Sequence, residues 1–201
     1  MPAQSVRIPI TNSILGSDYA GQIQLGSAGT KVNVILDTGS STLAVDHKAY
    51  DPSGDTSAKT TDLVQAVQYG SGSWIGSVVN TTVSVGGAGG DSVTGVPLAV
   101  AYHESVHMFS PAQGILGLAF EVLDTAYDIG KPSIPPHYTP NQIQASKHTV
   151  VTPYFNQLAS EGEGPKRQFA FLTKRSWMHV APGVSPDADP LNQGILVLGG
   201  G

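Results

Sequence analysis

One carboxylate in this sequence stands in a turn of small and hydroxyl-bearing residues, a setting that suits acid–base chemistry. Asp37 ends an apolar, β-branched run and is followed directly by Thr38-Gly39-Ser40-Ser41. Gly39 allows the backbone to bend sharply, and the hydroxyls can donate hydrogen bonds to the acid. A carboxylate held in this way can serve as a general acid or base. The same residues also favour an ordinary β-turn between two strands, so this stretch alone leaves both interpretations open.

A second stretch matches a metal-site pattern. His103-Glu104-Ser105-Val106-His107 fits His-Glu-x-x-His, in which a helix brings both imidazoles to one zinc ion while Glu activates water. However, a strand-like run ends at Tyr102, and Pro111 stops any helix within two turns. These neighbours favour a chance match in a surface loop or a short helical turn. A zinc metalloprotease stays an alternative, and we expect neither a metal nor an organic cofactor.

The composition excludes several classes of protein. Of 201 residues 24 are glycine, 40% are hydrophobic and only 12% are charged, which is typical of short strands joined by turns. The net charge of −5 predicts no nucleic-acid surface, and no apolar run is long enough to span a membrane. Cysteine is absent, which fits an exported protein without disulfides. We expect a secreted, extracellular or periplasmic location, with any signal peptide outside this sequence.

Strand-like segments run through the whole sequence and surround the acid. Apolar or alternating segments cover residues 6–10, 19–25, 32–36, 42–45, 65–68, 74–79, 78–85, 96–102, 169–173 and 195–198. Residues 65–68 and 74–79 flank Tyr69-Gly70-Ser71-Gly72-Ser73 and predict a long hairpin. The proline-rich residues 128–148 predict a long irregular loop. Thr152-Pro153 predicts a helix start with Thr152 as the N-cap.

Three separated motifs occur in the order and spacing of a known family. Asp37-Thr38-Gly39-Ser40-Ser41 resembles the catalytic turn of pepsin-like aspartic proteases, and Tyr69-Gly70-Ser71-Gly72-Ser73 resembles the tip of their flap hairpin. Gly114-Ile115-Leu116-Gly117-Leu118-Ala119 resembles the segment that threads behind the catalytic loop. Together with the Thr152-Pro153 helix and the closing residues 195–200, the motifs resemble the amino-terminal lobe of this family.

The resemblance implies an all-β fold with few short helices: one lobe of a bilobal pepsin-like aspartic protease, with a flap hairpin over the catalytic turn. Residues 1–201 would form this single amino-terminal catalytic lobe, and the carboxyl-terminal lobe would be absent from the chain. The implied activity is that of an aspartic endopeptidase, which hydrolyses polypeptides with two aspartates and an activated water molecule. Because like charges about 3 Å apart cannot both ionise, one acid acts as base and the other as acid, and this family is the standard example.

The resemblance also implies roles for particular residues. Asp37 would be one catalytic acid, with Ser40 donating to its outer oxygen and Thr38 reaching toward the second lobe. The remaining implied residues are Gly39 in the catalytic loop, Tyr69, Gly70 and Ser71 in the flap and at the substrate, and Ile35 and Ile115 along an apolar subsite. Without the resemblance, Tyr69 reads as a solvated hairpin tyrosine and the two isoleucines as core residues.

The sequence departs from the family pattern at two places that matter. Its one other candidate acid motif, Asp124-Thr125-Ala126, lacks the glycine, so only one catalytic aspartate is present. The second would come from a second catalytic lobe, on a separate or cleaved chain or, ranked lowest, on a second copy of this chain. Otherwise the lobe is inactive alone, or serves as a binding or inhibitory module. The tryptophan that pairs with the flap tyrosine in this family is Ala44 here, and Trp74 stands at a different position.

Overall fold

The computed structural model describes residues 5–12, 19–70, 72–86, 90–131, 134–136, 139–160, 167–174 and 193–199. The described strands are β1 (Ser5–Asn12), β2 (Tyr19–Leu25), β3 (Thr30–Asp37), β4 (Leu43–Asp46), β5 (Lys59–Tyr69), β6 (Gly72–Val85), β7 (Ser92–Glu104), β8 (Gly114–Gly117), β9 (Thr125–Asp128), β10 (Lys147–Val150), β11 (Phe169–Thr173) and β12 (Gln193–Gly199). The described helical segments are η1 (Pro52–Gly54), η2 (Glu121–Leu123), α1 (Pro140–Gln144) and α2 (Tyr154–Ser160). The predicted all-β class with few short helices is confirmed.

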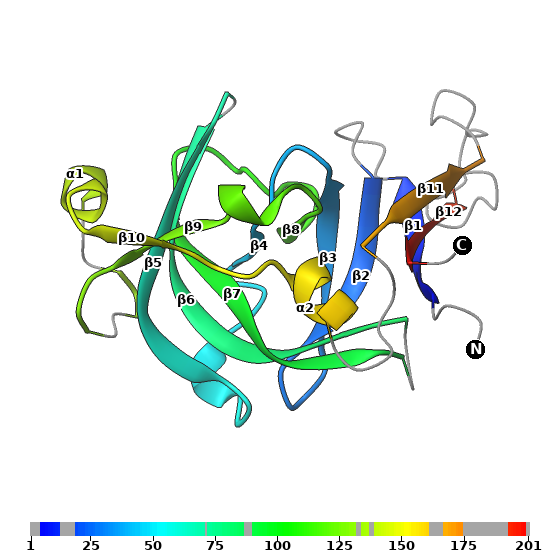
Figure 1. Ribbon diagram of the computed structural model, residues 1–201, viewed down its shortest axis with the longest axis horizontal. Helices are drawn as coiled ribbons and strands as arrows, with labels where there is room; N and C mark the ends of the chain where they lie inside the picture. The colour runs from blue at the N-terminus through cyan, green and yellow to red at the C-terminus, as the bar shows by residue number, and fades with distance from the viewer. Residues whose placement is uncertain are drawn as a thin grey trace.

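The described strands form one connected sheet in the order β10-β9-β5-β6-β7-β4-β8-β3-β2-β1-β12-β11 (Figure 1). Most neighbours are antiparallel, but β3 pairs with β8, and β4 with β7, in parallel. Strand β6 also pairs with β2, so the sheet folds back on itself. This folding brings segments far apart in the sequence to the two sides of one core.

The long hairpin of β5 and β6 stands out from the body of the sheet. Its two strands are 11 and 14 residues long, and Tyr69 pairs with Gly72 at the tip. Figure 1 shows the tip rising above the other labelled strands and helices. We call residues 64–77 the Tyr69 hairpin. The sequence predicted this hairpin, and the structure contains it.

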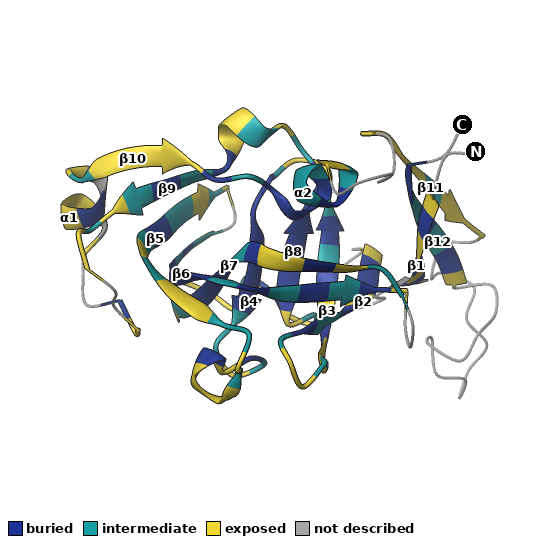
Figure 2. Ribbon diagram, turned by 60° about the horizontal axis from the view of Figure 1, so that its bottom comes forward, coloured by how far each residue is buried: buried dark blue, intermediate teal, exposed yellow. Residues whose placement is uncertain are grey.

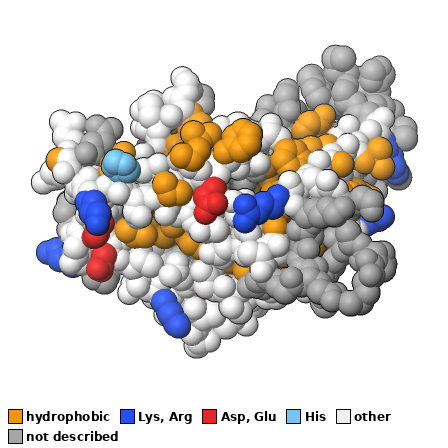
Figure 3. All heavy atoms as spheres, viewed as in Figure 1, with side chains coloured by type: hydrophobic (Ala, Val, Ile, Leu, Met, Phe, Trp, Pro, Cys, Tyr) orange, Lys and Arg blue, Asp and Glu red, His pale blue; other side chains and the backbone are white. Residues whose placement is uncertain are grey.

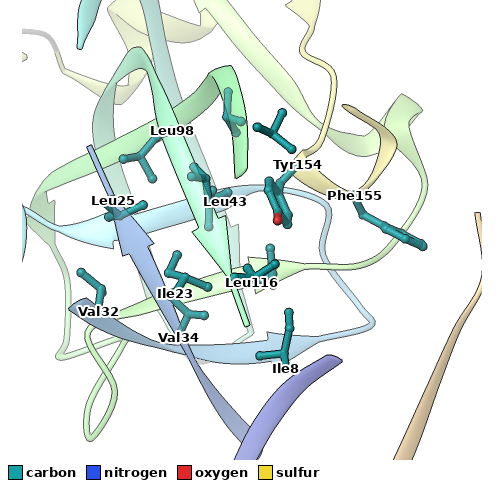
Figure 4. Packing of buried hydrophobic residues seen from close by; sticks show 14 of the residues in the cluster. Ile8, Ile23, Leu25, Val32, Val34, Leu43, Leu98, Leu116, Tyr154 and Phe155 are labelled. Atoms are coloured by element: carbon teal, nitrogen blue, oxygen red, sulfur yellow. The ribbon is translucent and has the colours of Figure 1, made fainter. Parts of the chain in front are cut away.

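The main core lies between the folded halves of the sheet and beneath α2. Strand β3 shows the alternation that a one-sided strand requires, since Val32, Val34 and Leu36 are buried while Lys31 and Asn33 are exposed (Figure 2). Figure 4 shows Val32 and Val34 among side chains from other segments, namely Ile8, Ile23, Leu25, Leu43, Leu98, Leu116, Tyr154 and Phe155. The base of the Asp37 turn is therefore packed from several directions.

Strand β8 passes between β3 and β4 at a distance that only glycine allows. A Cβ atom on Gly114 would lie 2.4 Å from the carbonyl oxygen of Ala44, and one on Gly117 would lie 2.4 Å from the carbonyl carbon of Ser41. Strand β8 hydrogen-bonds to β3 on one side and to β4 on the other. The predicted use of these glycines, close backbone approach inside the core, is confirmed.

Two local predictions are wrong. Residues 128–148 are not one irregular loop, because they include α1, whose N-cap Thr139 forms a capping box, and the start of β10. Proline is compatible with the first turn of a helix, so proline content alone does not indicate a loop. The helix predicted after Thr152 is present as α2 but begins at Tyr154, and only the predicted cap is wrong, because the Thr152 hydroxyl donates to Glu121 at 3.1 Å.

The close packing at β8 gives a first prediction. Replacing Gly117 by Ala should destabilise the fold by about 2–3 kcal/mol, because the added methyl group meets the backbone, which cannot rotate away as a side chain can. Thermal unfolding should then begin several degrees lower. The matched control is Gly54→Ala in η1, where an added Cβ meets nothing within 4 Å and the change in unfolding free energy should stay within about 0.5 kcal/mol. Equal stabilities of the two variants would contradict the threading described for β8.

Candidate active site

Asp37 lies at the end of β3, where the backbone turns out of the sheet. The N–H of Gly39 donates to Asp37 Oδ1 at 2.8 Å, and the Asp37 carbonyl oxygen accepts from the N–H of Leu118 at 2.8 Å. A Cβ atom on Gly39 would lie 3.2 Å from the same Oδ1, so glycine permits the close approach of this N–H. The carboxylate is half-buried, which leaves it within reach of a ligand. It is therefore both fixed and accessible.

The turn after Asp37 is held from behind by the end of β8. The N–H groups of residues 117–119 donate to three carbonyl oxygens of residues 37–42 at distances of 2.8–3.0 Å. The buried hydroxyl of Ser41 donates to the carbonyl oxygen of Phe120 at 2.7 Å, as expected of a residue that supports the turn. These hydrogen bonds link two segments about eighty positions apart, so the orientation of Asp37 depends on the tertiary fold.

One predicted hydrogen bond is not formed. The resemblance implies that Ser40 donates to Asp37, but among the described residues the buried Ser40 Oγ has no hydrogen-bond partner. The Gly39 N–H donates to Asp37 in its place. The Ser40 hydroxyl lies instead toward Tyr69, where it acts to lower the pKa of the Tyr69 phenol. Ser40 therefore belongs to the interface between the turn and the Tyr69 hairpin.

Tyr69 ends β5 and packs on an apolar cluster beside the Asp37 turn. We call this group the Tyr69 cluster; its buried members are Ala44, Trp74, Ala99, Ala101, Phe109 and Ile115, and Ile35, Val67, Tyr69 and Met108 pack against them. Ile35 and Ile115 are partners in the parallel pairing of β3 and β8. The structure thus brings together the predicted flap tyrosine and the two predicted subsite isoleucines, which the sequence places far apart.

The electrostatics of Tyr69 report how near it lies to the turn. Burial raises the pKa of the Tyr69 phenol above its usual value, and the negative charge of Asp37 adds to this. The side chains of Ser40 and Trp74 oppose the shift as hydrogen-bond donors would. Since hydrogen-bond effects act over short distances, the Tyr69 hydroxyl lies toward the side chains of Ser40 and Trp74, and it is near enough to the Asp37 turn to be affected by its charge. A solvated hairpin tyrosine, the alternative interpretation, does not describe this buried hydroxyl.

The remaining predicted residues lie around this centre. Thr38 is exposed and borders a groove of about 640 Å³ that runs along η2, α2 and β11, with Phe120 and Phe169 in its lining. Gly70 is exposed at the tip of the Tyr69 hairpin, with nothing within 4 Å of a Cβ placed on it. Ser71 lies outside the described residues.

The zinc-like pattern does not form a metal site in this fold. His103 and Glu104 end strand β7, so the helix that would align two imidazoles is absent there. Glu104 accepts from the N–H of Met108 at 2.9 Å, and a ring nitrogen of His103 lies 3.2 Å from the carbonyl oxygen of Pro136. Within the described ranges, no group of three potential metal-ligating side chains comes together. The chance match favoured by the sequence is what the structure contains.

The sequence offered Asp124 only as part of a motif without the required glycine, and it did not predict that this residue is a buried acid behind the turn. Asp124 is only 3% exposed, and its Oδ1 accepts from the hydroxyl of Thr42 at 2.8 Å and the amide of Gln65 at 2.7 Å. Burial raises the pKa of the Asp124 carboxyl, and the charge of Glu121 adds to the rise, while the two hydrogen bonds oppose it. The sequence near Asp124 carries no signal for this, because its partners come from other strands.

Comparison with known proteins places these features in a family. Residues 18–169 match the family model described as eukaryotic aspartyl protease. A vacuolar aspartic protease of Candida albicans is 32% identical over 96% of this chain and 40% of its own length. Vacuolar protease A of Aspergillus fumigatus is 26% identical over 84% of this chain and 44% of its own length. The chain therefore spans less than half of these relatives.

The fold has a solved counterpart as well. The crystal structure of an aspartic proteinase from Irpex lacteus superposes with a TM-score of 0.70 at 24% identity and covers 98% of this chain but 48% of that one. At this level of identity the likeness concerns the fold alone. The fold and the coverage both correspond to one lobe of a pepsin-like proteinase. Among the described helices, none is long and apolar enough to cross a membrane.

Asp124 gives a prediction about pH. A carboxyl whose pKa is raised by folding binds its proton more tightly in the folded state, so stability is greatest below the unfolded pKa and falls as pH rises through the folded pKa. Asp124→Asn keeps an oxygen that accepts from both Thr42 and Gln65 but removes the charge. The variant should be more stable than the parent at neutral pH and equal to it in acid, as measured by urea unfolding at several pH values.

The control for this experiment is an acidic side chain that is exposed to solvent. Asp62→Asn removes an exposed carboxylate on β5 and should leave the pH dependence of stability as it is in the parent. If Asp124→Asn were less stable than the parent at neutral pH, the ionised carboxylate would have to stabilise this cluster, contrary to the argument from burial.

Proposed function

Because this chain belongs to the eukaryotic aspartyl protease family, we propose that it supplies one catalytic aspartate, Asp37, and the flap of an aspartic endopeptidase. The observation that carries the proposal is the placement of Asp37. Its carboxylate is half-buried and oriented by the Gly39 N–H, and Ser40 of the same turn lies toward the buried hydroxyl of Tyr69 on a projecting hairpin. In this proposal residues 1–201 act as the amino-terminal catalytic lobe.

The chemistry requires a second acid. In the proposed reaction Asp37 and a second aspartate share one proton around a water molecule. The oxygen of the water molecule attacks the peptide carbonyl carbon while the ionised acid accepts a proton from this water. The protonated acid donates its proton to the carbonyl oxygen. The other acid near the turn, Asp124, is buried behind it and bonded to Thr42 and Gln65, so it cannot face the same water. One lobe therefore supplies only one of the two acids that the reaction requires.

A surface for a second lobe adjoins the turn. Phe120, directly before η2, and Val122 and Leu123 within it are 79%, 70% and 60% exposed. The groove between Phe120 and Phe169 carries this apolar surface to β11, the last strand in the sheet order. Figure 3 shows hydrophobic side chains across the upper half of this face, with few charges among them. Exposed apolar groups next to a sheet edge favour a partner that covers both. We propose that the second lobe, on the same or another chain, docks here.

The substrate is proposed to be a polypeptide in extended form. Such a segment can lie between the Asp37 turn and the Tyr69 hairpin and be held through its own backbone groups. An apolar side chain of the substrate would then contact the Tyr69 cluster at the partly buried Ile35, with Ile115 buried beside it. Gly70, at the open tip of the hairpin, would let the tip move to admit the chain. No metal or cofactor takes part.

A second candidate function is a binding or inhibitory module without catalysis. What supports it is that the described residues hold one accessible acid at the site and not two. Against it, a purely binding surface has no need of a carboxylate fixed by a turn N–H and by threading of β8. The names of the two relatives above place them in vacuoles, and we propose a secreted or comparable exported location for this protein.

The test of the proposed function is cleavage of an unfolded protein substrate at acid pH by the native protein, including any chain that co-purifies with it. Asp37→Asn should reduce kcat/KM by about 10³-fold or more, since a catalytic group that acts as part of a unit cannot be replaced by its neighbours. A transition-state-analogue peptide should block cleavage, and a metal chelator should not.

Two further readings complete this experiment. Asp62→Asn, which removes an exposed acid far along β5, should cleave as the parent does. Mass measurement of the native protein should show additional polypeptide beyond these 201 residues, attached or separate. Full cleavage by Asp37→Asn would end the proposal, and chelator-sensitive cleavage would point to metal chemistry.

A further inference from the structure

Three buried polar atoms beside the Asp37 turn lack hydrogen-bond partners among the described residues. They are the hydroxyl of Ser40, the hydroxyl of Tyr69 and the indole Nε1 of Trp74. They come from the turn, from the end of β5 and from the start of β6. An unsatisfied buried donor or acceptor costs about 1–3 kcal/mol, so three at one place call for an explanation.

The three atoms lie near one another. Trp74 and Tyr69 belong to the same Tyr69 cluster, and the side chains of Ser40 and Trp74 both act on the Tyr69 phenol as donors would. Their separations or angles fall outside the limits of a hydrogen bond in this structure. A small rotation of one ring, or one water molecule among the three, would satisfy all of them. The indole N–H can only donate, whereas the two hydroxyls can donate and accept.

Trp74 itself is firmly held. It is 1% exposed, it pairs with Val67 across the hairpin, and its ring lies 6.3 Å from that of Phe109. The space that it fills is made by small residues on the neighbouring strands, Ala44 on β4 and Ala99 and Ala101 on β7. The large indole ring and the three small alanine side chains fill one buried cluster, so the indole can rotate little.

We propose that Trp74 is the positioning residue of the Tyr69 hairpin: its indole N–H donates to the Tyr69 hydroxyl, directly or through one shared water molecule, and thereby sets where that ring lies over the Asp37 turn. Ala44 contributes by leaving the volume that the indole occupies. Only the catalytic consequence of this inference rests on the proposed function; the contact between the two rings does not.

The hydrogen bonds around Trp74 explain why it can act as a fixed point. Next to it, the N–H of Ser73 donates to the hydroxyl of Ser105 at 2.8 Å, and the N–H of Ser105 donates to the Ser73 carbonyl at 2.9 Å. Strand β6 is therefore hydrogen-bonded to the segment after β7 as far as Ser73, close to the tip of the hairpin. Tyr69 stands on the other strand, directly before exposed Gly70, where such fastening ends.

The test observes Trp74 directly in the folded 201-residue chain. The sequence has two tryptophans, so Trp177→Phe leaves the Trp74 indole N–H as a single resonance in proton–nitrogen NMR spectra. Adding Tyr69→Phe should move this resonance and speed its exchange with solvent by about 3- to 10-fold, because the N–H loses its acceptor. Adding Tyr19→Phe, the same chemical change at an exposed tyrosine on β2, should do neither. An indole resonance that is identical with Tyr69 and with Phe at position 69 would overturn the inference.

The second arm separates positioning from general packing. In the cleavage assay described above, Trp74→Phe and Tyr69→Phe should each lower kcat/KM by about 10-fold, and the double variant should be no worse than either single one, since both remove one interaction. Independent packing roles would make the losses multiply, which would contradict the inference. If the NMR result holds and no variant or parent cleaves peptide, the proposed function fails while the Trp74–Tyr69 contact stands.

Discussion

The contact of β8 with the back of the Asp37 turn is the constraint on which the rest of the structure depends. The strand lies between β3 and β4, and its continuing N–H groups bind the carbonyl oxygens of the turn. At two points the backbone of β8 comes closer to β4 and to the Asp37 turn than a Cβ atom would allow, and Gly114 and Gly117 stand at these points. The orientation of Asp37 is thereby set by folding. A catalytic carboxylate fixed beforehand needs no reorganisation when charge develops in the reaction.

The sequence predicts those parts of this arrangement that depend on residues close together in the chain. Asp37, the Tyr69 hairpin and the glycines of β8 are recognised because their signals are local: a strand ending in an acid, a glycine-rich tip, an apolar run with regular glycines. Period-two alternation over residues 78–85 also predicts the strand that ends β6. The meeting of Ile35, Ile115 and Tyr69 in one cluster needed the family resemblance, since strand order is not written in any one segment.

What the sequence could not predict depends on neighbours from other strands. The Ser40 hydroxyl faces Tyr69 and not Asp37, and only the packing of the hairpin on the turn decides between these. Asp124 is bonded to Thr42 and Gln65 across a separation of 82 and 59 positions. The proline-rich segment was wrongly predicted to be a loop although its sequence does carry a local helix signal. Pro140 begins α1, and Thr139 forms the capping box of this helix. Proline content and capping residues thus indicate different structures for the same segment, and the capping residues agree with the structure.

If it acts as the proposed flap, the Tyr69 hairpin must meet two requirements that oppose each other, and its structure divides them along its length. A cover over an active site has to open for a polypeptide and then return to one position above the acid. A hairpin that is flexible throughout would return to many positions, and a rigid one would not open. Here the returning strand is held by a hydrogen bond at Ser73 and by the burial of Trp74. At the tip, a Cβ atom placed on Gly70 would have no neighbour within 4 Å. Tyr69 stands at the boundary between the two parts. It can therefore move with the tip and still find the same partners when the tip closes.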